Sequence, residues 1–338
     1  MIRVGINGFG RIGRRVFRLL QDYNDIEVVA INDLSDVKTL SHLLKYDSIH
    51  GIFNGTISHE DNHIIVNNKK IILLNGHHPK DISWKSFDLD FVIESTGKFK
   101  TMKDLQYHII NGAKQVILSV PPIDEYIKTI VMGVNDDSID GSEIIISNAS
   151  CTTNNAAPMI DIINKLCGIN QAYITTVHSY TTDQSLHDQP HSDLRRARAA
   201  GQSIVPTTTG AAKALTKIFP ELSNVIGGCG IRVPVANGSL TDITFNVRKT
   251  VSIQDINNAF KEASLNKYKN ILEYTEDPIV SIDIVGNPHS CIFDSQMTSV
   301  IGNMVKIIGW YDNETGYSKR IIDLLCNLSE KNVVLSIK

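Results

Sequence analysis

Alternating apolar and polar stretches divide the first half of the chain into strands and helices. An apolar run at 2–7 is followed by a glycine-rich turn and by the segment 14–22, whose apolar positions share one helical face. A second apolar run at 27–32 completes a strand–helix–strand unit, which favours parallel strands and a right-handed crossover. Similar runs predict strands at 64–66, 71–74, 91–94, 116–119 and 144–147, and helices at 37–44 and 102–111. The first half is therefore predicted to be doubly wound α/β.

The pattern changes after residue 150. Helices are predicted at 156–166, 211–218, 253–264 and 318–328, a strand at 171–177, and strand-like segments at 239–249, 279–283, 290–294 and 304–311. A polar stretch at 179–202 is long enough to suggest a functional loop. We expect a Rossmann domain at 1–150 with a mostly parallel sheet, and an α+β catalytic domain at 151–316 with a mixed, largely antiparallel sheet. A C-terminal helix within 317–338 is expected to return to the first domain, and the tail 330–338 to be loosely held.

Composition narrows the class of protein. The 338 residues are 42% hydrophobic and 20% charged, as in a folded two-domain protein. A net charge of -3 gives no general attraction to nucleic acid or to an anionic membrane. No apolar stretch reaches the roughly 20 residues that span a bilayer, and no signal peptide precedes the first strand. Five scattered cysteines without CxxC spacing argue against disulfides and a metal site, so a cytoplasmic protein with reduced thiols is expected.

The turn after the first strand has the spacing of a dinucleotide-binding loop. Gly8, Gly10 and Gly13 form GxGxxG between a predicted strand and a predicted helix, and Asp33 follows roughly 20 residues later at the end of the second strand. Such a loop lets the pyrophosphate approach the free N–H groups of the helix, while the carboxylate accepts from the ribose 2′-hydroxyl. The acid would repel a 2′-phosphate, so NAD is favoured over NADP.

Cys151 lies in a run of small polar residues at 147–154 and directly precedes a predicted helix. A helix N-terminus or a nearby imidazole stabilises a thiolate, so this thiol is a candidate nucleophile. The competing interpretation is a buried structural cysteine. His178 follows a predicted strand and opens the long polar loop, where active-site residues are common, although most histidines have no catalytic role.

Two further groups of residues are suited to anions. The arginines at 195, 196 and 198 form a dense cluster, and Arg232 stands alone after a glycine-rich stretch. The segment 206–213 places threonine hydroxyls and a glycine before a predicted helix, which suits an anion but also ordinary capping. The basic residues are not interleaved with aromatic ones, so nucleic acid is not expected as the main partner.

With these features together, the chain resembles the phosphorylating glyceraldehyde-3-phosphate dehydrogenase family. The matching motifs lie in order along nearly the whole chain, at 5–14, 31–34, 42–48, 95–97, 147–154, 176–181, 193–200, 206–215, 232–234 and 311–314. The resemblance implies that Cys151 attacks the aldehyde of glyceraldehyde 3-phosphate, with His178 accepting the thiol proton and stabilising the oxyanion. Hydride transfer to NAD then leaves a thioester, which inorganic phosphate attacks to give 1,3-bisphosphoglycerate.

The resemblance also implies binding residues. Thr181 and Arg232 would hold the substrate phosphate, and the attacking phosphate would be held by Ser150, Thr152, Arg196, Thr209 and Gly210. The cofactor residues would be Gly8, Gly10, Arg11, Ile12, Gly13, Asp33, His77, Ser119 and Asn313. Sequence alone leaves open which arginine of the 195–198 cluster points inward. A homotetramer without metal is implied.

Four positions depart from the family pattern. Asn155 replaces a frequent second cysteine, which the mechanism does not need, and His77 replaces a usual arginine. Thr315 replaces a usual tryptophan beside Asn313, and Gln189 replaces a usual leucine in the long loop. The last two could affect cofactor binding. The open alternatives are erythrose-4-phosphate dehydrogenase, a sister activity on the same scaffold, and a secondary non-catalytic binding role.

Overall fold

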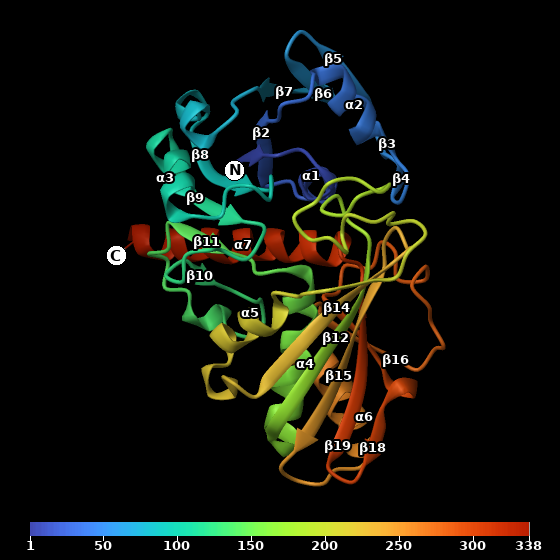
Figure 1. The fold of residues 1–338 in the computed structure, drawn as a ribbon. Helices are drawn as coiled ribbons and strands as arrows, with labels where there is room; N and C mark the ends of the chain where they lie inside the picture. The colour runs from blue at the N-terminus through green and yellow to red at the C-terminus, as the bar shows by residue number, and fades with distance from the viewer. Residues whose placement is uncertain (338) are drawn as a thin grey trace. The chain divides into compact units, whose positions relative to one another are not determined.

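Strand β1 (Ile2–Asn7) lies in the middle of a nine-stranded sheet in the computed structural model, which describes residues 1–337. The order across the sheet is β10-β11-β9-β8-β1-β2-β7-β6-β5 (Figure 1). The other strands are β2 (Ile26–Asn32), β5 (Ile57–Glu60), β6 (His63–Val66), β7 (Lys69–Leu74), β8 (Leu89–Glu94), β9 (Ala113–Leu118), β10 (Lys128–Thr129) and β11 (Ile145–Ser147). All neighbours from β10 to β7 are parallel, whereas β7, β6 and β5 are antiparallel. The predicted mostly parallel, doubly wound sheet is confirmed.

Helices and short turns complete this first unit, which comprises Met1–Ile130, Asp136–Ala149 and Ser318–Lys338 as far as the last is described. The helices are α1 (Arg11–Leu20), α2 (Val37–Lys45), α3 (Met102–Ile110) and most of α7 (Thr315–Ile337), with 3₁₀ turns at Pro79–Asp81, Lys85–Phe87 and Asp136–Ser138 and a small hairpin of β3 (Tyr46–Asp47) and β4 (Gly51–Ile52). The backbone of α7 stays helical beyond residue 330, and Lys338 lies outside the described residues. Buried side chains from the strands and from α1 and α3 form the core.

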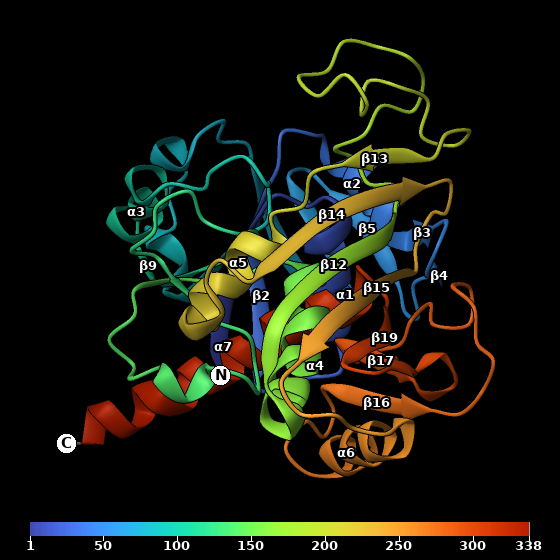
Figure 2. The same ribbon diagram turned by 60° about the horizontal axis from the view of Figure 1, so that its bottom comes forward.

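The second unit, Val131–Asn135 and Ser150–Tyr317, contains an eight-stranded mixed sheet. Its strands are β12 (Ile169–Ser179), β13 (Val205–Thr207), β14 (Ile226–Val233), β15 (Ser239–Val247), β16 (Leu272–Thr275), β17 (Cys291–Asp294), β18 (Ser299–Ile301) and β19 (Met304–Tyr311). Only the β12–β14 and β16–β17 pairs are parallel, as expected for a largely antiparallel sheet. Helix α4 (Cys151–Cys167) packs along one face (Figure 2), and α5 (Ala211–Ile218), α6 (Ile253–Leu265) and the 3₁₀ turns Pro220–Leu222 and Ser295–Met297 complete the unit.

Three expectations for the second unit differ from the structure. Helix α4 begins at Cys151 rather than at residue 156, because the Ser150 side chain caps it by accepting from Thr153 N. The strand predicted at 279–283 is wrong: this segment is a turn, in which the Asp283 carboxylate accepts from Val280 N. Strand β12 extends to Ser179, so His178 lies inside the strand rather than after it. No helix among the described residues is long and apolar enough to cross a membrane.

Candidate active site

Cys151 is the first residue of α4, and the chain reaches it through a tight turn. Ala149, two residues earlier, has φ 57°, a left-handed conformation that is uncommon for a residue other than glycine. The Ser150 side chain caps Thr153 N at 3.1 Å. The N–H groups of Cys151 and Thr152 have no intrahelical acceptor because they lie in the first turn. The thiol therefore lies beside the positive end of a 17-residue helix.

The side chain of His178 comes from β12 and faces this thiol. Cys151 Sγ lies 3.4 Å from Nε2 of the ring. The other nitrogen, Nδ1, lies 2.7 Å from the carbonyl oxygen of Ser179, which can only accept, so Nδ1 carries the hydrogen. This tautomer turns the lone pair of Nε2 toward the sulfur. The imidazole is thus oriented to take the thiol proton.

Arg232 packs against the same histidine from the neighbouring strand β14, where it is the register partner of His178. Its Nη1 donates to Ser179 O at 2.9 Å and to Thr181 Oγ1 at 3.3 Å, and it lies 3.0 Å from His178 Nδ1. Because the carbonyl contact of Nδ1 is the shorter, we assign Arg232 and the imidazole as two donors that share Ser179 O. The arrangement places a cation beside a neutral imidazole.

Burial and Arg232 determine the charge state of the pair. Burial raises the pKa of the Cys151 thiol, and the positive charge of Arg232 opposes that shift. Burial, followed by repulsion from Arg232, lowers the pKa of His178 to about 3. Without ligands, both groups are therefore neutral near pH 7, and the imidazole is available as a base.

Tyr311, at the end of β19, connects two threonines next to the Cys151–His178 pair. Its buried hydroxyl bonds to Thr152 Oγ1 at 2.9 Å and to Thr176 Oγ1 at 3.0 Å. Its ring meets the His178 ring edge to face, with centroids 5.9 Å apart. Sequence reasoning matched the motif at 311–314 but gave Tyr311 no role. Only the pairing of β12 and β19 with β15, which lies between them, brings this residue to the histidine.

Asn313 is held by two serine hydroxyls. Its Oδ1 accepts from Ser179 Oγ at 2.8 Å and from Ser239 Oγ at 3.0 Å. These two bonds identify the oxygen end of the amide and hold it. The opposite end is therefore the Nδ2 group, which can donate to a ligand. The sequence pattern gave no role to Ser179, although this residue contacts both His178 and Asn313.

The cationic cluster at 195–198 presents one arginine to the threonine segment. Arg196 Nε donates to Thr207 Oγ1 at 3.0 Å, and its guanidinium also contacts Thr208 O and the carboxylate of Asp183. The Arg198 side chain is 66% exposed and pairs with Asp188 instead. Near the same segment, Gly210 is the N-cap residue of α5, and the Oγ1 of Thr209 accepts from Ala211 N.

The predicted dinucleotide loop joins β1 to α1 in the first unit. Gly8 has φ 90°, and a Cβ there would lie 2.7 Å from Thr96 N, so only glycine fits. A Cβ at Gly13 would lie 2.2 Å from Gly8 O. Gly10, in contrast, faces open space and is the N-cap residue of α1, whose first residues are Arg11 and Ile12. The loop therefore has the close packing and the open helix end that a pyrophosphate requires.

Four other residues of the first unit are also predicted to contact the cofactor, namely Arg11, Asp33, His77 and Ser119. The Asp33 carboxylate accepts from Phe9 N at 2.8 Å and from Ser35 N at 3.0 Å, which fixes its position after β2. The guanidinium of Arg11 is paired with Asp47, which leaves the Arg11 backbone as its contribution to an anion site. Ser119 is buried after β9, and His77 is exposed after β7.

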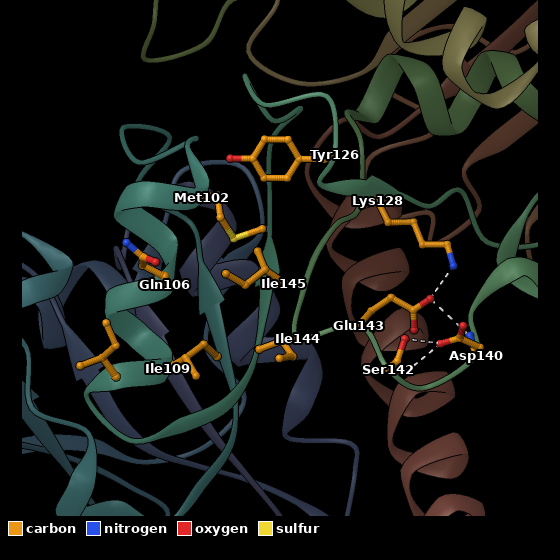
Figure 3. A pocket seen from close by; sticks show the side chains of 11 residues that line it. Met102, Gln106, Ile109, Tyr126, Lys128, Asp140, Ser142, Glu143, Ile144 and Ile145 are labelled. Carbon is orange, nitrogen blue, oxygen red and sulfur yellow. Dashed lines mark hydrogen bonds and ion pairs between the residues drawn. The ribbon is translucent and has the colours of Figure 1, made fainter.

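One pocket of the first unit contains none of these residues. It has a volume of about 550 Å³ and lies between α3 and the 140–145 loop (Figure 3). Its lining is mostly apolar, with Lys128 and Glu143 paired at one end. Among the described residues, no group of three or more His, Cys, Asp or Glu side chains is placed to hold a metal ion.

The first unit has the architecture of a dinucleotide-binding domain, and the second pairs a thiol with an imidazole base, which together define an NAD-dependent dehydrogenase of the thiol type. Comparison with known families agrees. Residues 2–102 match the model described as "Glyceraldehyde 3-phosphate dehydrogenase, NAD binding domain", and residues 150–313 match the one described as "Glyceraldehyde 3-phosphate dehydrogenase, C-terminal domain". The chain belongs to the glyceraldehyde-3-phosphate dehydrogenase family.

Curated relatives match over nearly the whole chain. The glyceraldehyde-3-phosphate dehydrogenase of Streptomyces coelicolor is 53% identical, over 96% of this chain and 97% of its own length. That of Geobacillus stearothermophilus is 49% identical, over 98% and 99%. Glyceraldehyde-3-phosphate dehydrogenase 1 of Bacillus cereus is 47% identical, over 98% and 100%. The resemblance found in the sequence motifs is confirmed, and so is NAD as the cofactor.

Proposed function

We propose that this chain oxidises glyceraldehyde 3-phosphate with NAD and inorganic phosphate to 1,3-bisphosphoglycerate, and that Cys151 and His178 carry the chemistry. The observation that carries the site assignment is the 3.4 Å contact of Cys151 Sγ with a ring nitrogen whose lone pair faces the sulfur. The relatives named glyceraldehyde-3-phosphate dehydrogenase support the reaction.

The first step forms a carbon–sulfur bond. Cys151 Sγ attacks the aldehyde carbon while its proton passes to His178 Nε2, and the carbonyl oxygen becomes an oxyanion. The protonated imidazole and the backbone N–H groups at the start of α4 stabilise this charge, and the imidazole then returns its proton to give a thiohemiacetal.

The second step oxidises the thiohemiacetal. Bound NAD supplies the acceptor for the hydride that leaves the substrate carbon. As the hydride leaves, His178 Nε2 takes the hydroxyl proton, so the carbon becomes a thioester of Cys151. An oxygen of inorganic phosphate then attacks the thioester, the carbon–sulfur bond breaks, and 1,3-bisphosphoglycerate leaves. The protonated His178 returns its proton to the sulfur, which restores the thiol and the neutral imidazole.

Two groups of residues are assigned to the two phosphates. Arg232 and Thr181, which contact each other at 3.3 Å, would bind the C3 phosphate of the substrate. The attacking phosphate would be bound by Arg196, by the hydroxyls of Ser150, Thr152 and Thr209, and by the Gly210 cap of α5. Because Arg196 already contacts the threonine segment, it is a better choice than the exposed Arg198.

The cofactor is assigned to the edge of the first sheet where the strands end. Gly8, Gly10, Gly13, Arg11 and Ile12 would bind the pyrophosphate, and the Asp33 carboxylate would bind the adenine ribose. His77 is assigned to the adenine, Ser119 to the nicotinamide end and Asn313 to the carboxamide. The last assignment is supported by the two serine hydroxyls that hold the amide oxygen of Asn313, because its Nδ2 group is then the end available to a ligand.

The reaction is tested by comparing two aldehydes. NAD reduction would be followed with glyceraldehyde 3-phosphate and with erythrose 4-phosphate, each with and without inorganic phosphate. The proposal predicts a larger kcat/KM for glyceraldehyde 3-phosphate and sustained turnover only when phosphate is present. A larger kcat/KM for erythrose 4-phosphate, or turnover independent of phosphate, would favour the sister activity instead.

We also propose a homotetramer in the cytoplasm. The sheet of the second unit leaves one face without helices, where Tyr173 of β12 is 53% exposed beside partly exposed neighbours, so this face is suited to bind another copy. Cytoplasmic location is supported by the need to keep Cys151 reduced and by five cysteines that are all free thiols. Sedimentation of the purified protein would test the tetramer.

A further inference from the structure

A buried row of polar side chains crosses the ends of three neighbouring strands in the first unit. Asn7 ends β1 and is the register partner of both Glu94, which ends β8, and Asn32, which ends β2. The three residues are between 0% and 3% exposed. The reaction as described uses none of them, although the glycine loop begins at the next residue after Asn7.

The carboxylate of Glu94 accepts from three neighbouring residues, Asn7, His108 and Thr96. Its Oε2 accepts from Asn7 Nδ2 at 2.5 Å and lies 3.1 Å from His108 Nε2. Because Trp84 Nε1 donates to His108 Nδ1 at 3.0 Å, the His108 hydrogen is on Nε2 and points to Glu94. The other oxygen, Oε1, accepts from Thr96 N at 2.9 Å and from the Thr96 hydroxyl. Four donors therefore meet two acceptor oxygens.

These bonds connect the segments around the dinucleotide loop. On one side, Asn7 Oδ1 accepts from Asn32 Nδ2 at 2.8 Å, and Asn32 Oδ1 accepts from Gly76 N at 2.7 Å. On the other side, Glu94 fixes Thr96, whose backbone lies directly against Gly8. The loop and the 95–97 turn are also joined by Ser95 Oγ, which donates to Gly8 O at 2.7 Å.

We propose that Glu94 is a positioning residue of the NAD site, because its carboxylate sets the distance between the glycine loop and the 95–97 turn. A carboxylate is required, since only a group with acceptors at both ends matches donors on both sides. The inference deepens the NAD-binding part of the proposed function and concerns binding of the cofactor rather than the thiol chemistry.

The test is the isosteric variant Glu94→Gln in the full-length protein. Whichever way the new amide turns, its NH2 group faces at least one group that can only donate, His108 Nε2 on one side or Thr96 N on the other, so the buried hydrogen bonds have to rearrange. We expect the Kd for NAD, measured by calorimetry, to rise about tenfold or more, which is the loss expected from one mismatched buried pair. The kcat at saturating NAD and the rate of Cys151 alkylation should change less than about threefold, because the thiol site is not altered.

Glu143→Gln is the matched control. Glu143 is also a buried carboxylate of the first unit, with an 8% exposed side chain, but it pairs with Lys128 beside the pocket of Figure 3. Its variant should keep the NAD affinity. Equal affinities for the Glu94→Gln variant and the unmodified protein would overturn the proposal. So would a Glu94→Gln variant without the native circular dichroism spectrum, because positioning alone leaves the apolar core intact.

A charge swap separates positioning from general destabilisation. Asn7→Asp alone places two acceptors against each other, whereas Asn7→Asp combined with Glu94→Gln restores a donor facing an acceptor between β1 and β8. The double variant should bind NAD more tightly than either single variant, although the mismatch at His108 keeps it weaker than the unmodified protein. Additive losses in the double variant would contradict the proposed role.

Discussion

Ser179 O accepts from His178 Nδ1 at 2.7 Å, and this contact decides what the histidine can do for Cys151. With Nδ1 occupied as a donor, the opposite nitrogen has a lone pair 3.4 Å from the sulfur. The same carbonyl also accepts from Arg232, which disfavours a second proton on the ring. The Ser179 carbonyl thus orients the base, whereas burial and Arg232 lower the pKa of His178 and keep it neutral.

Replacing His178 by asparagine should impair both catalysis and thiol reactivity. The variant lacks the base, so we expect kcat to fall by about 10² to 10⁴. Alkylation of Cys151 by iodoacetate should slow near neutral pH and approach the rate of the unmodified protein at high pH, where hydroxide can remove the thiol proton. Alkylation that is equally fast at neutral pH would remove His178 from the pair.

Acid should destabilise the fold through His178. Its pKa is about 3 in the folded protein, against about 6.5 for a solvent-exposed histidine, so the unfolded chain binds a proton at higher pH. The stability that neutral His178 contributes is complete above about pH 6.5 and is lost as the pH falls toward 3. Between pH 7.5 and 5, His178→Asn should lose about 2 kcal/mol less unfolding free energy than the unmodified protein. Denaturant titrations at both pH values measure this difference, and equal losses would contradict the depressed pKa.

Removing the hydroxyl of Tyr311 should lower the stability of the protein, because two buried threonine hydroxyls lose a hydrogen-bond partner. Tyr311→Phe leaves Thr152 Oγ1 and Thr176 Oγ1 without their shared partner in a buried region, which costs about 1–3 kcal/mol. Thermal unfolding should show a lower Tm, whereas Tyr126→Phe, at an exposed position, should leave it unchanged. A Tyr311→Phe variant as stable as the unmodified protein would show that the bridge is dispensable.

Replacing Arg196 and replacing Arg198 should affect the KM for inorganic phosphate differently. Arg196→Ala should raise the KM for inorganic phosphate about tenfold or more, since a charged hydrogen bond is lost, with little change in the KM for the aldehyde. Arg198→Ala should change neither, because Arg198 pairs with Asp188 at the surface. Asp183→Asn should lower the KM for phosphate by removing a carboxylate that occupies Arg196. Initial-rate measurements at varied phosphate decide, and equal effects of both arginine variants would contradict the assignment.

Local patterns predicted most of the fold and the positions of the candidate residues. The strand–glycine loop–helix order at the N-terminus was clear because periodicity and turn residues agree there. Strand β14 was missed because Gly227, Gly228 and Gly230 disfavour a strand. The structure gives the reason: a Cβ at Gly228 would lie 2.8 Å from Ile174 O, so the close approach of β12 requires glycine.

The start of α4 and the partners of the site were harder to predict. Thr152, Thr153 and Asn154 are poor helix formers and Pro158 lies inside the helix, so the predicted start fell after Cys151. Tyr311 and Ser239 reach the site from strands far along the chain. Local sequence patterns do not predict how such distant strands pair. Family resemblance supplied residue roles that spacing alone left open, Arg196 among them.

In the proposed mechanism, Cys151 carries the substrate as a thioester that phosphate must release. The most direct test mixes the enzyme with NAD and glyceraldehyde 3-phosphate in the absence of phosphate and follows NADH formation and protein mass in the same sample. We expect a burst of about one NADH per site, an acyl adduct on the peptide that contains Cys151, and loss of both on Cys151→Ser. Adding phosphate should release the adduct and restore turnover. Sustained NADH formation without phosphate, or a burst that leaves Cys151 unmodified, would contradict the account.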